Sequence, residues 1–400
     1  MKKTYIDTAM ERIAPDLILK GGNVVDVFSG RVIKADVIIK DGIICGVGSY
    51  SGENEQDVSG KYIMPGFIDS HVHIESSMTQ PSEYAKAVMP HGITTVIADP
   101  HEITNVCGED GLEFMLKSAK NIPLDVNLML PSCVPATPFE HTGANLDAKT
   151  TQKLAPKFFG IGEMMNYPGI VSGDDETLGK LCLDIIDGHA PLLSGHELDA
   201  YASAGIKTDH ECSVVEEMTE KISKGMYILL REGTLSLDVA KLIKGVTPYT
   251  LRRCAFCTDD RFVGEIIRDG SIDHCIRKAV SLGLNNIDAI IMATLNACEI
   301  YGMKNKGAIA PSYIADIVVA DDLNLSSISQ VYKNGKLVCE NGKALFECET
   351  VDNSKVTNTV HLPKISADFF KTDVKDKFDA IELIPESIIT KKVTVSYSDS

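Results

Sequence analysis

The stretch Tyr62–His73 constrains this chain more than any other, because an apolar run leads directly into two histidines. The apolar residues over 62–68 predict a buried strand, and the polar Asp69 marks its end. Side chains two residues apart on a strand face the same side, so His71 and His73 can point into one cavity. Two neutral imidazoles in one cavity are good ligands for a divalent metal ion. A lone His-x-His is short enough to arise by chance, so this interpretation depends on further ligands elsewhere in the chain.

The middle of the chain predicts a closed α/β barrel. Residues 62–302 span about 240 residues, close to the roughly 250 typical of a (β/α)8 TIM-like barrel. Eight apolar segments alternate there with helical patterns, which indicates parallel strands. The fifth, over 183–187, could instead continue the preceding helix, and the sixth, around 204–206, is brief. A helix over Ser213–Lys224 is expected to begin with a capping box, in which its first serine is the N-cap. The eight segments end near Asp69, Asp99, Pro131, Glu163, Gly188, Asp209, Arg231 and Thr258.

Both flanks of this barrel are typical of short antiparallel strands. Runs of β-branched residues broken by Gly-Gly, Ser-Gly and Asp-Gly fill residues 16–44, and a similar pattern with an Asn-Gly turn returns over 315–338. We therefore expect both flanks to build one small β-sandwich into which the barrel is inserted. Beyond it, a strand over 393–400 is expected in a further β-rich segment that this chain does not complete. The expected domains are residues 1–61 (sandwich), 62–302 (barrel), 303–345 (sandwich) and 346–400 (further segment).

Ionisable residues gather at the predicted strand ends, where a barrel of this kind carries its working residues. Five of the chain's ten histidines fall there. Buried histidines and carboxylates at such positions are costly unless they are paired or bind a metal ion. The candidates are His71, His73, His101, Glu102, Glu163, His189, His210, Glu211, Glu232 and Asp259. The histidines not expected to be ligands are His91, His141, His196, His274 and His361.

Two divalent metal ions are the simplest occupants of such a cluster. We expect His71, His73 and Asp259 to hold one ion and His189 and His210 to hold the other. Glu163 would then bridge the two ions through its carboxylate. Two-metal sites hold their ions roughly 3.5–4 Å apart and activate a water molecule between them.

The composition restricts the partners and the compartment. A formal net charge of −17 argues against a nucleic-acid partner and leaves a small molecule as the expected substrate. The first residues lack the apolar segment of a secretory signal, and no uncharged apolar run reaches the ~20 residues of a membrane span. Eleven cysteines, Cys254 and Cys257 among them, predict reduced thiols in a cytoplasmic protein instead of a disulfide framework.

Several phrases of the sequence resemble the amidohydrolase superfamily of metal-dependent hydrolases, and most closely its adenine deaminase family. The likeness runs from about residue 16 through the tail phrase at 388–392. It implies a cytoplasmic purine-salvage enzyme that converts adenine and water to hypoxanthine and ammonia. It also implies two divalent ions, Mn²⁺ or Fe²⁺ with Zn²⁺ as the alternative. Members of the family continue well past the end of this chain, so we expect it to be either a fragment or a natural short form without the family's C-terminal part. The phrases are Pro65–Met78, Asp99–Ile103, Gly162–Gly169, Asp187–Pro191, Thr208–Glu211 and Cys257–Arg261.

A reaction scheme follows from these candidates. A metal-activated hydroxide would attack C6 of the purine, and Asp259 would take its proton and pass it to the departing amine. Glu102 is expected to protonate the ring nitrogen beside C6, with Glu211 and Glu232 as the alternatives. An ion pair with an arginine or lysine at the barrel mouth is the alternative role for Glu102. His101 could bind metal, orient the water or hydrogen-bond the base.

Two other functions stay open from the sequence. The same barrel and metals would serve the hydrolysis of another cyclic amide or N-acyl compound, because the choice of substrate lies in the loops. An inactive, truncated chain with a binding role would instead carry no metal. A homo-oligomer is expected from base rates alone.

Overall fold

The computed structural model describes residues 2–371, 376–385 and 390–396. Strands from both flanks of the chain lie in one nine-stranded sheet with the order β17-β16-β15-β14-β5-β1-β2-β3, and β4 pairs with β1. The two flanks meet where β5 pairs antiparallel with β14 and parallel with β1. The bounds are β1 Leu17–Asp26, β2 Arg31–Lys40, β3 Ile43–Gly48, β4 Glu55–Asp57, β5 Tyr62–Pro65, β14 Ile317–Ala320, β15 Ile328–Lys333, β16 Lys336–Glu340 and β17 Lys343–Ala344.

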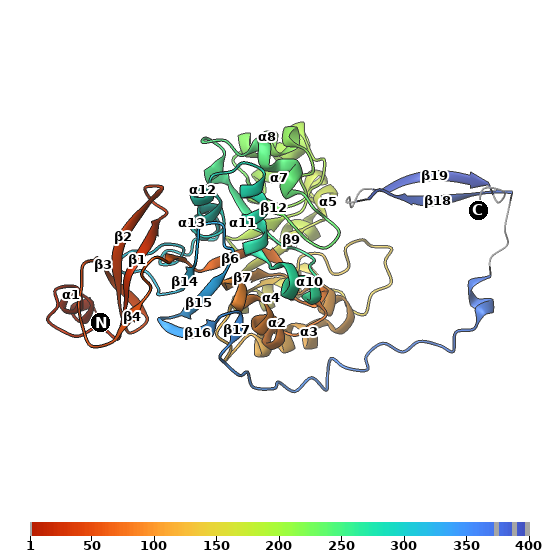
Figure 1. Ribbon diagram of the computed structural model, residues 1–400. Helices are drawn as coiled ribbons and strands as arrows, with labels where there is room; N and C mark the ends of the chain where they lie inside the picture. Colours follow the sequence, from red (N-terminus) through yellow and green to blue (C-terminus); the bar gives the residue numbers. More distant parts are fainter. Residues whose placement is uncertain (1, 372–375, 386–389, 397–400) are drawn as a thin grey trace.

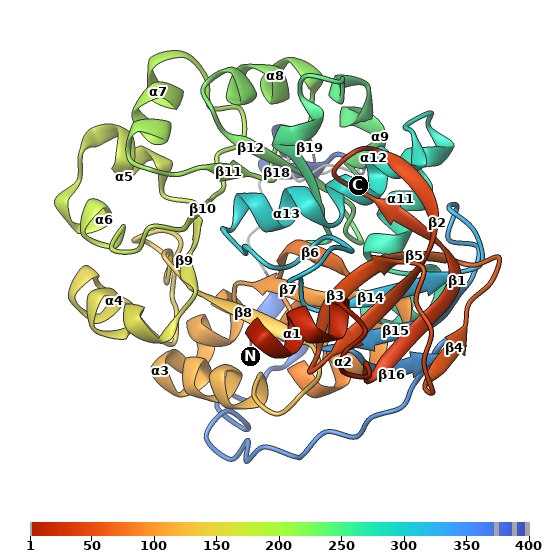
Figure 2. The ribbon, with the colours of Figure 1, turned by 90° about the vertical axis from the view of Figure 1, so that its left-hand side faces the viewer.

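A curled parallel sheet forms the centre of the molecule, and most of the helices lie around its outside (Figure 2). Five strands have the order β10-β9-β8-β7-β6, and three more have the order β11-β12-β13. A parallel bridge between Val72 and Asp259 joins the end of β13 to the end of β6. At the other edge, Gly188 N donates a hydrogen bond to Thr208 Oγ1 over 3.0 Å. The bounds are β6 Phe67–Val72, β7 Ile93–Ala98, β8 Asp125–Leu130, β9 Gly160–Met164, β10 Ile186–Gly188, β11 Thr208–Asp209, β12 Tyr227–Arg231 and β13 Cys254–Cys257.

The helices alternate with these strands along the chain, which is the pattern that parallel strands require. None of the helices in the described residues is long and apolar enough to span a membrane. The α-helices are α1 Lys2–Ala9, α2 Pro81–Val88, α3 His101–Ser118, α4 Ala148–Leu154, α5 Tyr167–Ser172, α6 Asp175–Gly179, α7 Gly195–Ser203, α8 Val215–Ser223, α9 Val239–Leu242, α10 Val263–Asp269, α11 Ile272–Ser281, α12 Asn286–Met292 and α13 Leu295–Ile300. The 3₁₀ turns are η1 Glu75–Ser77, η2 Met89–His91, η3 Ala155–Lys157, η4 Ile243–Gly245, η5 Leu251–Arg253 and η6 Ala367–Phe370.

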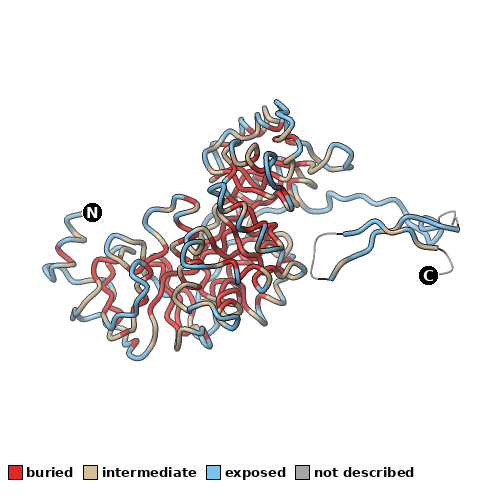
Figure 3. Tube along the Cα trace, turned by 90° about the horizontal axis from the view of Figure 1, so that it is seen from above, coloured by how far each residue is buried: buried red, intermediate tan, exposed pale blue. Residues whose placement is uncertain are grey.

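The buried residues concentrate in the parallel strands and the helix faces against them (Figure 3). Every position of β6 and β7 is buried, because helices or other strands cover both faces. The segment after β17 is largely exposed, and it ends in the hairpin of β18 (Lys377–Leu383) and β19 (Thr390–Ser396), apart from the rest of the molecule (Figure 1). Of the strand predicted over 393–400, residues 397–400 lie outside the described residues.

The prediction of one strand over 62–68 is wrong, because two strands occupy this stretch. Tyr62–Pro65 forms β5 of the nine-stranded sheet, whereas β6 begins at Phe67 and carries the first histidine. Gly66 separates the two strands, and its N–H donates a hydrogen bond to Asp316 O over 2.9 Å. A Cβ at this glycine would collide with the Thr94 side chain, so the close approach requires glycine.

Two other element predictions are also wrong in position. The sixth parallel strand is Thr208–Asp209, and residue 204 instead caps the end of α7. Helix α8 begins at Val215 and lacks a side-chain cap, so the predicted serine N-cap is absent. Glu217 Oε2 accepts a hydrogen bond from the Ser213 backbone N–H over 3.5 Å, and this bond satisfies a donor just before the helix.

Candidate metal centre

The ends of the parallel strands bring together all the predicted site residues except Glu232. Several triads of histidine and carboxylate residues occur here, and within each triad the ligand atoms lie within 4.8 Å of one another. The triads share members and therefore lie side by side, as two adjacent ions would require. Among them are His71, His73 and Glu163; His71, His210 and Asp259; His73, His101 and Glu102; and Glu163, His189 and His210.

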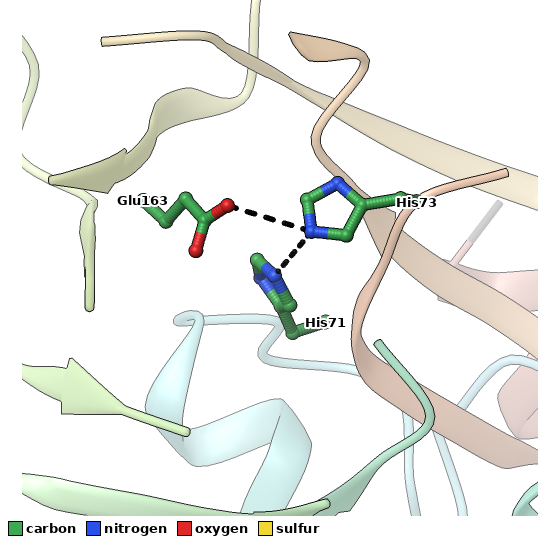
Figure 4. A group of neighbouring side chains, drawn as sticks. All are labelled: His71, His73 and Glu163. Atoms are coloured by element: carbon green, nitrogen blue, oxygen red, sulfur yellow. Dashed lines mark hydrogen bonds and ion pairs between the residues drawn. The ribbon is translucent and has the colours of Figure 1, made fainter. Parts of the chain in front are cut away.

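The rings of His71 and His73 meet at one point beside Glu163 (Figure 4). His71 Nδ1 donates to Asp187 Oδ2 over 2.7 Å, and His73 Nδ1 donates to the Asp99 carbonyl over 2.8 Å. Each ring is thereby oriented with its Nε2 toward the other ring, and this nitrogen carries no hydrogen when the ring is neutral. The two Nε2 atoms lie 3.0 Å apart, within hydrogen-bond distance. A proton shared between them holds this contact in the metal-free protein, and a metal ion would take the place of that proton.

Glu163, at the end of β9, divides its carboxylate between two groups of histidines. Its Oε1 lies 3.5 Å from His73 Nε2 and 3.1 Å from His101 Nδ1. Its Oε2 lies 2.6 Å from His189 Nδ1 and 3.1 Å from His210 Nε2. A carboxylate with one oxygen in each group has the arrangement of a bridge between two ions.

Asp259 follows β13 and faces the first pair of histidines. Its Oδ1 lies 3.1 Å from His73 Nε2 and 3.7 Å from His71 Nε2. Its backbone has a φ of 57°, in the left-handed region that non-glycine residues rarely adopt. Two backbone hydrogen bonds hold it there, from Asp259 N to His71 O (3.0 Å) and from His73 N to Asp259 O (3.1 Å). Strain of this kind is typical of functional positions.

Glu102 and His101 begin α3 at the side of the cluster. Glu102 Oε2 lies 3.6 Å from His73 Nδ1, and Glu102 Oε1 accepts from Ser76 Oγ over 2.9 Å. Glu75, which the sequence analysis did not single out, lies beside Glu102. Burial and the neighbouring Glu102 carboxylate raise the pKa of Glu75 to about 8. Its spacing of two residues from His73 repeats the spacing of His71 and His73, and this signal could have found it.

Arg231 is a second residue whose role the strand-end rule did not identify. It is buried at the end of β12 and forms ion pairs with Glu211 and Asp259. Glu232 turns away from the cluster and pairs with Lys278. Among the described residues, the ion pairs of Glu232 do not include any of the histidines. The structure thus brings Glu211 into the cluster and leaves Glu232 outside it.

The carboxylates give this site a strong preference for positive charge. Burial alone would lower the pKa of His71, but Asp187 raises it to about 9. The pKa of His189 is raised to about 9 in the same way, because Glu163 outweighs burial. Conversely, burial would raise the pKa of Glu163, but the positive charge of His189 holds it well below its usual range. In the metal-free protein, protons supply the positive charge that the carboxylates attract.

The donor set fits divalent metal ions. Several buried ring and carboxylate atoms of the cluster have no hydrogen-bond partner within the described chain, and imidazole with carboxylate suits Zn²⁺, Fe²⁺ and Mn²⁺. The atoms without such a hydrogen bond are Asp99 Oδ1, His101 Nδ1, Glu102 Oε2, His210 Nδ1 and His210 Nε2. Two of them, His101 Nδ1 and His210 Nε2, meet Glu163 only as ion pairs over 3.1 Å, so either nitrogen would be available to a metal ion.

A cavity of about 770 Å³ opens beside Glu102. Its lining includes the carboxylates of Glu75 and Glu102 and the apolar side chains of Val106 and Phe114. The segment after β17 contributes Val356 to its wall. Glu102 is the member of the candidate cluster that lines this cavity.

The fold and this donor set are those of a metal-dependent hydrolase. The Amidohydrolase family matches residues 62–338, which is more than half of the chain. The chain therefore belongs to the amidohydrolase family and acts as a hydrolase of C–N bonds. An enamidase structure has a TM-score of 0.59 at 18% identity and covers 83% of this chain and 97% of that chain. The β-aspartyl dipeptidase of Fervidobacterium islandicum AW-1 has a TM-score of 0.58 at 20% identity, with 84% and 99% covered.

Curated relatives specify the branch of this family. Adenine deaminase 2 of Desulfotalea psychrophila is 46% identical over 402 residues, which cover 98% of this chain and 70% of the relative. The adenine deaminase of Clostridium acetobutylicum is 48% identical over 397 residues, which cover 97% of this chain and 70% of the relative. Identity at this level over nearly the whole chain places it among the adenine deaminases of the amidohydrolase family.

Proposed function

We propose that this chain hydrolyses adenine to hypoxanthine and ammonia, as part of purine salvage. The observation that carries the proposal is the likeness to adenine deaminases over nearly the whole chain, together with a complete set of candidate metal ligands at the strand ends. The eleven free cysteines support a reducing, cytoplasmic setting.

The metal centre of this proposal holds two divalent ions, Mn²⁺ or Fe²⁺, with Zn²⁺ as the alternative. His71, His73 and Asp259 would hold one ion, and Glu163 would be shared with the other. The remaining ligands of the second ion would be His189 and His210. Such ions lower the pKa of a coordinated water, so that a nucleophile is available near neutral pH.

Two of the chain's own residues move protons in this reaction, and a third orients a reactant. Asp259 Oδ1 faces the histidine pair and takes a proton from the attacking water, which it then gives to the departing amine. Glu102 lies between the cluster and the cavity and protonates the ring nitrogen beside C6, where attack on C6 places negative charge. Its competitors are engaged elsewhere, Glu211 with Arg231 and Glu232 with Lys278. His101, beside Glu102 and 3.1 Å from Glu163, orients the water or the base.

The architecture that we propose for this function is one (β/α)8 barrel inserted into a small β-sandwich. The bridge between Val72 and Asp259 supports closure of the eight parallel strands into one ring. A core cluster that mixes residues of both flanks, Val24, Ile63 and Val319 among them, supports the sandwich. With β5 counted to the sandwich, the domains are those expected from the sequence.

Ammonia release from adenine by the purified chain, reconstituted with Mn²⁺ or Fe²⁺, tests the proposal. We expect activity that falls by roughly 10²–10⁴-fold in Asp259→Asn, since a positioned acid–base group contributes about this much. A panel of cyclic amides and N-acyl compounds belongs in the same assay. Turnover of one of these, without ammonia release from adenine, would assign the site to another substrate.

The variant Glu102→Gln tests the proposed ring acid. The side chain is not a ligand in our assignment, so the variant should keep two metal ions per chain while kcat falls roughly 10²-fold. Glu113→Gln is the matched control, because Glu113 lies on the same helix α3 but pairs with Lys117 on the surface. Unchanged turnover in Glu102→Gln would remove this residue from the mechanism.

A further inference from the structure

Arg231 connects three carboxylates that follow different strands. Glu211 follows β11, Asp238 lies in the loop after β12, and Asp259 follows β13. The side chain of Arg231 is 3% exposed, so solvent does not share its donors. A buried arginine with three acidic partners holds three separate loops in one arrangement.

The donors of Arg231 are all occupied by these partners. Nε and Nη2 donate to Asp238 Oδ2 over 3.1 and 3.0 Å. Nη2 also donates to Glu211 Oε2 over 3.3 Å, and Nη1 donates to Glu211 Oε1. Nη1 further donates to Asp259 Oδ2 over 2.8 Å. A guanidinium that is saturated in this way is not available to bind a substrate.

The two oxygens of the Asp259 carboxylate have different partners. Oδ2 accepts a hydrogen bond from Arg231, whereas Oδ1 faces the Nε2 atoms of His71 and His73. Backbone hydrogen bonds fix the main chain of Asp259 but not the rotation of its carboxylate, which is broad in aspartate. The side-chain orientation therefore depends on Arg231 at Oδ2 and on the histidine pair at Oδ1, and Arg231 is the partner outside the metal centre.

We propose that Arg231 is a positioning residue for the hydrolysis: it holds Asp259 with one oxygen toward the metal centre. This inference rests on the proposed function, in which Asp259 moves protons. Asp238 in turn holds the outer edge of the guanidinium and so fixes the direction of Arg231. Lysine would supply one charged donor at this place but not the planar fork, so it replaces arginine only in part.

The variants Arg231→Gln and Arg231→Lys, both assayed as metal-loaded full chains, test this role. For Arg231→Gln we expect two bound metal ions, a KM for adenine within about threefold of the wild-type value and a kcat lower by roughly 10²-fold, because small misplacements of a reacting group cost about this much. Arg231→Lys should recover part of the loss. Arg253→Gln is the matched control, since Arg253 lies over the Tyr227 ring and contacts the Gly225 carbonyl, away from the metal centre.

Crystal structures of the metal-loaded variants give a readout that a merely structural role would not move. We expect the Asp259 carboxylate to be rotated in Arg231→Gln and restored in Arg231→Lys. A kcat within twofold of wild type, or an unmoved carboxylate, would overturn the proposal. If Arg231→Gln does not fold, Arg231→Lys and Asp238→Asn test the proposal instead. The proposal requires both variants to lower kcat without raising the KM for adenine. Wild-type protein without activity on adenine would refute the proposed function, and the carboxylate orientation would still decide the role of Arg231.

Discussion

At the scale of single residues, the site depends on the hydrogen bonds that orient each histidine ring. The Asp187 carboxylate and the Asp99 carbonyl bind the Nδ1 atoms of His71 and His73, so the Nε2 atoms point toward the centre of the cluster. Without these acceptors, each ring could present either nitrogen to the centre. Metal affinity therefore depends on groups that never touch the ions.

Metal loading of this site should release protons. The pKa values of His71, His101 and His189 are raised to about 9 in the metal-free protein, so these rings are protonated at pH 7 and must lose protons to bind metal. We expect the apparent Kd for Mn²⁺ to fall as the pH rises from 6.5 to 9. Calorimetric titration in buffers of different ionisation enthalpy measures the protons released. His196→Gln, at an exposed helical position, is the control, and metal uptake without proton release would contradict the raised pKa values.

At the scale of elements, β10 and β11 are the shortest strands of the curled sheet, with three and two residues. These two neighbouring strands approach each other closely at Gly188. A Cβ at this position would collide with the Thr208 carbonyl. Since His189 directly follows Gly188, the spacing of these two strands sets the position of a candidate ligand.

Gly188→Ala should therefore damage both stability and metal binding. We expect a loss of about 1–3 kcal/mol in the free energy of unfolding, as for other overpacked sites, and weaker binding of the second metal ion. Gly264→Ala is the matched control, because a Cβ at Gly264 in α10 meets no atom within 4 Å. Denaturant unfolding and metal analysis of both variants check this, and equal behaviour of the two would show that the strands can separate without harm.

Long apolar patterns made most of the parallel strands predictable from sequence. β7, β8 and β12 begin and end within about two residues of their predicted bounds, because largely apolar segments of this length have a clear pattern. A two-residue strand such as β11 has no period to detect. The histidines were found because strand ends are local features of the sequence. Arg231 was not, because its role depends on partners that only the fold brings near.

At the scale of the whole molecule, the site needs strands from both ends of the central segment. Its ligands come from β6 at one end of the central segment and from the residue after β13 at the other. Any ion that binds this arrangement favours the folded state over the unfolded chain. Metal content and global stability are therefore coupled.

Removal of the metal ions should lower the stability of the entire chain. At a free metal concentration of 100 times Kd, binding adds about 2.7 kcal/mol per site, which a chelator takes away. His71, whose folded pKa of about 9 exceeds its unfolded value, stabilises the metal-free protein fully below about pH 6.5, and this contribution is lost as the pH rises through 9. The fall in Tm on chelation should thus be larger at pH 9 than at pH 6.5. An equal fall in Tm at both pH values, or no fall at either, would contradict the coupling between metal binding and stability.

Asp259 lies beside His71 in the fold but far from it in the sequence, so the ribosome synthesises the two halves of this contact at different times. About 190 residues separate the two, so at 5–20 residues per second the first histidines wait roughly 10–40 s for their carboxylate partner. The nine-stranded sheet closes later still, when β14 reaches β5. During this interval the apolar strands lack their neighbours and are exposed to chaperones and to other nascent chains. Metal capture by the full candidate set consequently waits until residue 259 has been synthesised, long after the first two histidines.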